Sequence, residues 1–118
     1  MSERRSVQEI HTCVGQIVAL FPLLECAQCA VAVMQWLDRS KIDYQLLRLK
    51  PKRRSDLFIV SDRVVSGESM TENGMHYGVE VLGKVFDNLS TEGLSREDWL
   101  RDFSCRSRGF IIEEINRF

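Results

Sequence analysis

Apolar residues recur at helical spacing in two early stretches: Ile10, Val14, Ile17 and Val18, and then Ala30, Val33, Met34 and Leu37. Ser6 and Glu9 stand three residues apart just before the first stretch and form a capping box, in which each side chain satisfies an amide at the start of a helix. The spacing predicts helices over about 7–20 and 26–39, and Pro22 ends the first of them.

The remainder of the chain changes to the patterns of β-strands. Residues 44–49 are apolar and alternate modestly, and 57–60 is a short continuous apolar run of the kind that forms a buried central strand. A short helix that begins after Ser95 and a last strand over 110–112 complete the order. Helices followed mainly by sheet predict a single α+β domain over 1–118, with N-terminal helices packed on an antiparallel sheet.

Charge and composition narrow the classes of function. With 16 Lys and Arg against 17 Asp and Glu, the formal net charge is -1, so no overall field attracts nucleic acid or an anionic membrane surface. No apolar run reaches the roughly 18–20 residues of a membrane span, and no apolar segment follows the N-terminal basic residues as in a signal peptide. We therefore expect a cytoplasmic protein without a membrane or nucleic-acid partner, and a protein or peptide as its substrate.

Four cysteines are the unusual feature of the composition: Cys13, Cys26, Cys29 and Cys105. Without an export signal we expect them to be reduced. Cys26 and Cys29 form a Cys-x-x-Cys pair in the first turn of the second predicted helix. Unpaired backbone N–H groups and the positive end of the helix dipole stabilise a thiolate there. Because the thiolate is the nucleophilic form, this position favours attack on a carbonyl carbon.

A predicted β-hairpin over 76–88 supplies partners for such a nucleophile. A two-residue turn at 82–83, or one residue later, places His76 and Asp87 on the same face of the sheet. With the first of these turns Asp87 lies opposite Gly78, which leaves room for the imidazole to lean across. The two side chains are then within reach of each other.

A cysteine, a histidine and an aspartate in this arrangement predict a catalytic triad. His76 takes the proton of Cys29 or Cys26, and Asp87 fixes the orientation and tautomer of the imidazole. In this hypothesis the cysteine attacks a carboxamide or peptide carbonyl, His76 protonates the leaving amine, and water hydrolyses the acyl-enzyme. An amine in place of water gives transamidation. No cofactor and no metal are expected.

These residues lie in stretches that resemble the papain fold toxin 2 family: FPLLECAQCA (21–30), SDR (61–63), NGMHYGVE (73–80), GKVFDN (83–88), EGL (92–94) and WLRDF (99–103). The resemblance implies a papain-like fold with a Cys-His-Asp triad, in an effector domain of bacterial polymorphic toxins. It further implies peptidase or glutamine deamidase activity in the producing or target cell, and a cognate immunity protein as partner.

The nucleophile remains a choice between two residues. Papain-like enzymes carry Cys-Gly-Ser-Cys-Trp-Ala with the second cysteine as nucleophile, which points to Cys29 and gives it a slight preference. Cys26 is the alternative, because it is nearer the helix start and feels the dipole more fully. Gln16 and Gln28 are candidates for the oxyanion-hole side chain on residue type alone.

Two other interpretations of the cysteines compete with the triad. Cys26, Cys29, His76 and Cys105 have the side chains of a Cys3His zinc site. A Cys-x-x-Cys pair at a helix start is also the redox geometry of a thiol–disulfide protein. The alternative to a hydrolase is a zinc- or disulfide-stabilised interaction domain without enzymatic activity. Within the triad hypothesis, a reversible disulfide between Cys26 and Cys29 would mask the nucleophile.

Overall fold

The computed structural model describes residues 5–53, 55, 57–64, 69, 71, 73–105 and 109–116. Its helices are α1 (Val7–Val18), α2 (Cys26–Arg39) and α3 (Arg96–Arg101), and its strands are β1 (Gln45–Pro51), β2 (Val60–Ser61), β3 (His76–Val81), β4 (Lys84–Asp87), β5 (Ser90–Leu94), β6 (Phe103–Ser104) and β7 (Phe110–Ile115). Five of these strands form one sheet in the order β5-β4-β3-β1-β7, and every neighbouring pair is antiparallel. The predicted α+β class is confirmed.

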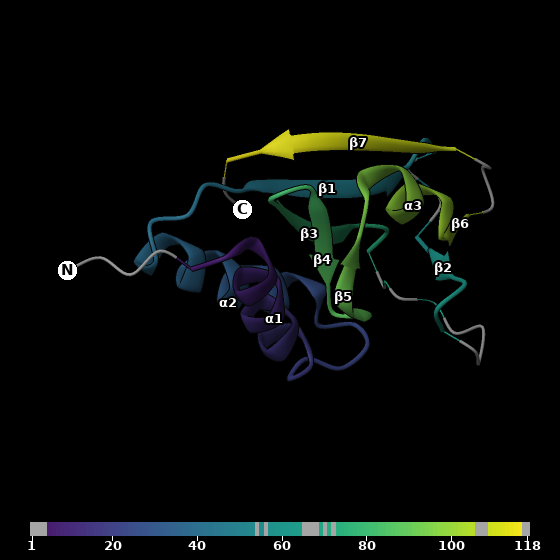
Figure 1. Cartoon of the computed structure of the whole chain (residues 1–118). Helices are drawn as coiled ribbons and strands as arrows, with labels where there is room; N and C mark the ends of the chain where they lie inside the picture. Colours follow the sequence, from purple (N-terminus) through teal and green to yellow (C-terminus); the bar gives the residue numbers. More distant parts are fainter. Residues whose placement is uncertain are drawn as a thin grey trace.

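The two long helices begin where the sequence predicts. The Ser6 hydroxyl accepts a hydrogen bond from the backbone N–H of Glu9 at 3.1 Å, as the capping box requires. Helix α1 ends at Val18, before Pro22, and α2 begins at Cys26. Helix α1 packs on β5 and β4, and α2 packs on β3, so the pair lies together along the sheet (Figure 1). No helix in the described part of the chain is long and apolar enough to cross a membrane.

The predicted hairpin forms with the first of the two turns considered. Leu82 and Gly83 have φ angles of 49° and 86°, the left-handed values of a two-residue type I′ turn. Val81 pairs with Lys84 and Val79 with Phe86. This register continues to Asp87 opposite Gly78 and thus sets the position of the candidate site.

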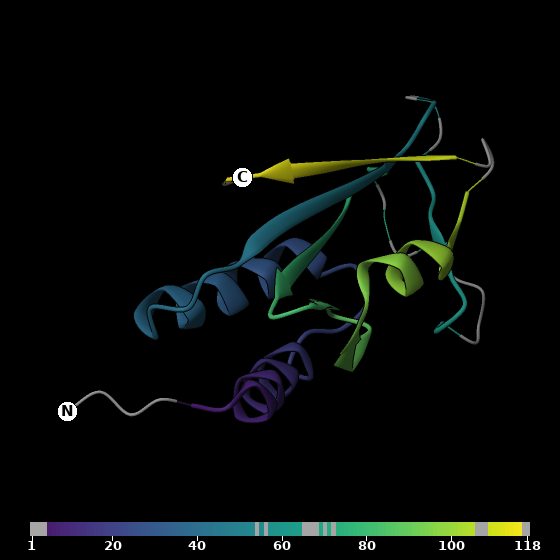
Figure 2. The same cartoon turned by 45° about the horizontal axis from the view of Figure 1, so that its top comes forward.

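The sheet has apolar side chains on both faces. The face toward α1 and α2 buries Leu46, Val79, Val81 and Phe86. The other face buries Leu47, Leu49, Val85, Trp99 and Phe103. Helix α3 supplies Trp99 to this second face, and Figure 2 shows α3 beside β5 and away from α2. The sheet is therefore the middle layer between two hydrophobic clusters.

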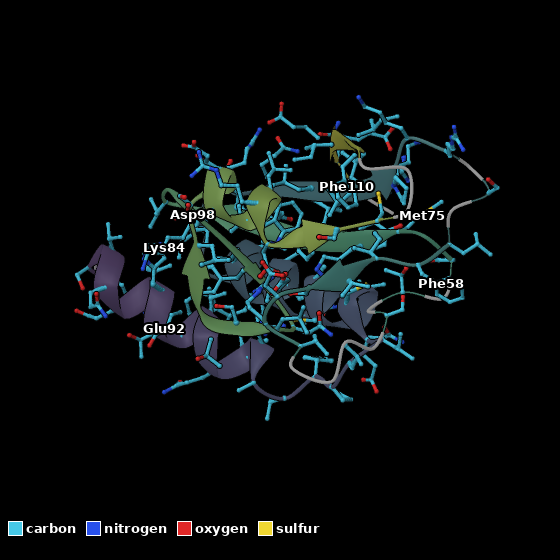
Figure 3. All side chains as sticks on the ribbon, turned by 90° about the vertical axis from the view of Figure 1, so that its right-hand side faces the viewer. Phe58, Met75, Lys84, Glu92, Asp98 and Phe110 are labelled. Carbon is cyan, nitrogen blue, oxygen red and sulfur yellow. The ribbon has the colours of Figure 1, made fainter. Side chains whose placement is uncertain are left out.

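The expectation of a buried central strand over 57–60 is wrong. Phe58 is 61% exposed and lies at the periphery of the molecule in Figure 3. Val60 and Ser61 pair with Ser104 and Phe103 of β6 in a separate two-stranded sheet, and Val60 also forms an isolated bridge with Ser69. The centre of the main sheet is filled by β1, β3 and β4, and a four-residue apolar run cannot by itself indicate which sheet it joins.

Candidate active site

Cys26 is the first residue of α2, and the chain before it bends sharply. Leu24 has a φ of 74°, in a left-handed region that leucine rarely adopts. The Asn88 side chain fixes this bend by donating to the Pro22 carbonyl at 2.8 Å. The N-cap residue, Glu25, makes no side-chain capping bond. The N–H groups of the first helical turn are therefore left for the Cys26 sulfur or for a ligand.

The Cys26 thiol is buried next to the start of β3. Its sulfur is 3.9 Å from the carbonyl oxygen of Met75, to which the thiol donates. Burial by itself raises the pKa of this thiol, but the hydrogen bond and charge of His76, with the backbone N–H groups of Tyr77 and Ala27, outweigh burial and lower it. Cys26 is thus held in surroundings that favour its thiolate.

Cys29 lies one helical turn further on and has the opposite environment. It is 1% exposed and belongs to the apolar cluster between α2 and the sheet. Burial, followed by the negative charges of Asp87 and Cys26, raises the pKa of its thiol to about 12. The geometry therefore favours Cys26 over Cys29, against the slight preference that the papain-like motif suggested.

His76 and Asp87 meet as the hairpin register predicts. Nε2 of His76 lies 2.9 Å from Oδ2 of Asp87, and both side chains are fully buried. Burial lowers the pKa of the imidazole, but hydrogen bonds and charges from Asp87 and Cys26 outweigh it and raise the pKa of His76 to about 9. With Nε2 bonded to Asp87, Nδ1 is the nitrogen left for Cys26, and Nδ1 has no well-aligned hydrogen-bond partner among the described residues.

Gly78 makes room for a different ring from the one expected. A Cβ at this position would stand 2.9 Å from the indole of Trp99 and 2.8 Å from a methyl of Val85. The missing side chain thus admits Trp99, and not the imidazole of His76. Because Trp99 fits there, its indole N–H reaches Oδ2 of Asp87 at 2.8 Å.

Asp87 is surrounded by donors that the sequence did not reveal. Arg63 binds it through two nitrogens, each 2.8 Å from a carboxylate oxygen. The backbone N–H of Leu89 adds a bond of 3.0 Å, so with Trp99 and His76 the carboxylate accepts five hydrogen bonds. A buried aspartate requires a cationic partner, and arginine suits bidentate pairing with a carboxylate. The sequence thus indicates that Asp87 needs such a partner, but residue spacing does not identify which arginine it is.

A cavity of about 200 Å³ opens beside Cys26. The described residues that line it are uncharged: Leu24, Cys26, Ala27, Thr71, Asn73, Met75 and Tyr77. The carbonyl oxygen of the Asn73 side chain accepts from the backbone N–H of Met75 at 3.1 Å, which leaves its amide nitrogen to donate. Gln16 and Gln28 are exposed and do not line this cavity; Gln16 borders a separate groove along α1.

The alternative zinc set is not assembled in the described part of the chain. No group of three or more His, Cys, Asp and Glu side chains there is arranged to hold a metal ion. Cys105, a member of that set, instead donates from its sulfur to the Gly109 carbonyl at 3.4 Å. Cys13, Cys26, Cys29 and Cys105 form no disulfide in the described part of the chain.

Comparison with known proteins identifies the family of the chain. A sequence model of the family described as Papain fold toxin 2 matches residues 9–104. The chain belongs to the Papain fold toxin 2 family. The match includes most of α1, all of α2 and the hairpin, and also the residues that surround Asp87. No match is found among curated proteins or among solved structures.

Proposed function

We propose that this member of the Papain fold toxin 2 family is a cysteine hydrolase of amide bonds, with Cys26 as nucleophile, His76 as general base and acid, and Asp87 as the residue that orients His76. The observation that carries the proposal is the buried pair of His76 and Asp87, with 2.9 Å between Nε2 and Oδ2, together with the interaction of His76 with Cys26 at the start of α2 that lowers the pKa of this thiol. Membership of the family supports a toxin or effector role.

The first step follows from the charges at the site. Because the pKa of Cys26 is lowered and that of His76 is raised to about 9, transfer of the thiol proton to the imidazole is favoured, which gives a thiolate–imidazolium pair. The thiolate attacks the carbonyl carbon of the amide and gives a tetrahedral intermediate. His76 then donates its proton to the leaving nitrogen, and an acyl-enzyme remains on Cys26.

The second step regenerates the enzyme. Water, deprotonated by the now neutral His76, attacks the acyl carbon and releases a carboxylic acid with the Cys26 thiol. Ammonia is the first product when the substrate is a glutamine side chain, and an amine-ended peptide is the first product when the substrate is a peptide bond. An acceptor amine in place of water gives transamidation from the same acyl-enzyme.

The oxyanion of the intermediate requires donors near Cys26. We assign this role to the backbone N–H of Cys26 and to the side-chain amide of Asn73, which lines the cavity with its nitrogen left to donate. Replacing Asn73 with alanine is expected to lower kcat by about 10²-fold, with a smaller change in KM. An unchanged kcat in Asn73→Ala would assign the oxyanion to other donors.

The cavity supports a neutral substrate group. Because the described residues that line it carry no charge, they favour a carboxamide or a peptide group, whose desolvation costs less than that of a carboxylate or an ammonium group. A volume of about 200 Å³ holds one side chain or a short segment of backbone, which suits glutamine deamidation and peptide cleavage alike. An immunity protein that covers this cavity is the partner that the toxin role requires.

The test follows product formation from glutamine-containing proteins and peptides. Ammonia release together with the mass change of a carboxamide that becomes a carboxylate indicates deamidation, and new peptide termini indicate cleavage. Cys26→Ala is expected to abolish either product, while Cys29→Ala retains it. Activity that survives in Cys26→Ala and disappears in Cys29→Ala would overturn the assignment of the nucleophile.

A further inference from the structure

Arg63 contacts the proposed triad only at Asp87 among the described contacts. Within the same part of the chain, it contacts neither Cys26 nor the residues that line the cavity. Its side chain is 19% exposed and follows β2, far in sequence from the hairpin. Two of its nitrogens bind Asp87 at 2.8 Å, and its Nε binds Oδ2 of Asp102 at 2.9 Å. The guanidinium also lies over the Phe103 ring, 5.6 Å from the ring centre. One side chain therefore joins two buried carboxylates.

The second carboxylate is fixed as firmly as the first. Asp102 is 8% exposed and accepts a hydrogen bond from the Ser61 hydroxyl as well as from Arg63. The Ser61 hydroxyl oxygen in turn accepts from the backbone N–H of Arg63 at 3.1 Å, and the Asp102 carbonyl accepts from the N–H of Asp62 at 3.0 Å. The turn that carries Arg63 is thus tied to α3 and β6 at several points.

The charged groups alternate in sign along this chain of contacts. Asp102 meets Arg63, Arg63 meets Asp87, Asp87 meets His76, and His76 meets Cys26. His76 is also faced by two uncharged rings, Trp99 with centroids 6.0 Å apart and Phe103 at 5.2 Å. Among the described residues, Cys29 is a further titratable group that interacts with Asp87.

We propose that Arg63 is a positioning residue: its guanidinium holds the Asp87 carboxylate toward His76 and neutralises part of its charge, so that the imidazolium can still release its proton. An aspartate without this cation would bind the imidazolium more strongly, because an unopposed buried negative charge favours the protonated ring. A general acid held in that way transfers its proton less readily to the leaving amine. The inference rests on the proposed triad and adds a residue to it.

The experiment is an NMR titration of the imidazole groups. The chain has two histidines, so His11 serves as an internal reference for His76. In Arg63→Ala the His76 titration is expected to move to higher pH by about one pH unit, since a nearby positive charge is removed. Arg63→Lys retains the charge and is expected to return the titration close to that of the wild type. Arg96→Ala, which removes an arginine paired with Glu80 and Glu114, is the matched control and leaves His76 unchanged.

Asp102→Asn tests the role of Arg63 with an expected shift of the His76 titration in the opposite direction. It removes a negative charge beyond Arg63 and keeps an acceptor for Ser61, so the His76 titration is expected to move to lower pH. This variant also decides the matter if Arg63→Ala does not fold. A purely structural Arg63 would leave the titration in place, or move it to lower pH in Arg63→Ala as Asp87 turns away. Either result overturns the proposal.

The titration does not depend on catalysis, so the two proposals fail separately. If Cys26 proves unreactive while the His76 titration moves as described, the proposed function fails and the role of Arg63 stands. If the enzyme is active and the Arg63 variants leave the titration unmoved, the proposed function stands and the inference about Arg63 fails.

Discussion

The two faces of the central sheet solve different physical problems. The face toward α1 and α2 is stabilised by apolar side chains such as Leu46, Val79 and Phe86, which need only be removed from water. The opposite face buries ionised groups among its apolar ones: Asp87 is 1% exposed and His76 is fully buried. Buried charges require partners at fixed distances, and here these come from four separate segments. The spacing of apolar residues in the sequence therefore predicts the first face, whereas the second face depends on the distances between residues from separate segments.

The same contrast separates Cys26 from Cys29 on one helix. Cys29 is packed within the apolar cluster, where its thiol stays protonated because its pKa is raised to about 12. Cys26, one turn earlier, reaches the edge of the charged network through His76. Three residues of sequence separate an inert thiol from the proposed nucleophile.

The largest loss of stability is expected on the apolar face. Leu46 is 1% exposed, and Leu46→Ala removes most of its buried side chain and leaves a cavity. The free energy of unfolding should fall by about 2–5 kcal/mol in urea unfolding. The His76 titration should remain where it is in the wild type, because no charge near the imidazole changes. A shifted titration in this variant would show that the two faces are coupled.

A smaller loss of stability, with a change in the site, is expected from the charged face. Trp99→Phe keeps most of the ring but removes the indole N–H that donates to Asp87 at 2.8 Å. A hydrogen bond to a charged group contributes about 1.5–3 kcal/mol, so the free energy of unfolding should fall within that range. With one donor fewer, Asp87 presents more negative charge to His76, and the titration should move to higher pH. If the titration did not move, the indole would matter for packing alone.

The smallest effect is expected from the interaction between Cys26 and His76, and it is measured as a shift of the His76 titration. The thiolate raises the pKa of His76, so removing it in Cys26→Ser should move the His76 titration to lower pH. A change of about one pH unit corresponds to roughly 1.4 kcal/mol of interaction. Cys29→Ser is the matched control and should leave the titration unchanged. Equal changes in the two variants would contradict the difference drawn between the thiols.

Much of the scaffold follows from local patterns in the sequence. The capping box fixes the start of α1, and the two-residue turn at Leu82 and Gly83 sets a register in which His76 and Asp87 share a face. These predictions succeed because they depend on residues close together in the chain. The prediction of a central strand over 57–60 is wrong because distant segments of the chain determine which strands fill the centre of the sheet.

The finer parts of the site depend on packing between distant segments. Both cysteines occupy the first turn of α2, and only the way α2 packs on β3 decides which of them meets His76. Arg63 reaches Asp87 through a two-residue strand paired with β6, for which the sequence has no periodic signal. The sequence indicates that Gly78 makes room for a neighbouring ring, but the ring that fills this space is Trp99 of α3.

The most direct test is the alkylation rate of each cysteine measured against pH by mass spectrometry, in the wild type and in His76→Ala. We expect Cys26 to react well below the pH of an ordinary thiol, Cys29 to stay nearly unreactive, and His76→Ala to slow Cys26 by about 10–100-fold near neutral pH. If Cys26 reacts no faster than a free thiol and is indifferent to His76→Ala, or if Cys29 reacts first, Cys26 is not the activated nucleophile.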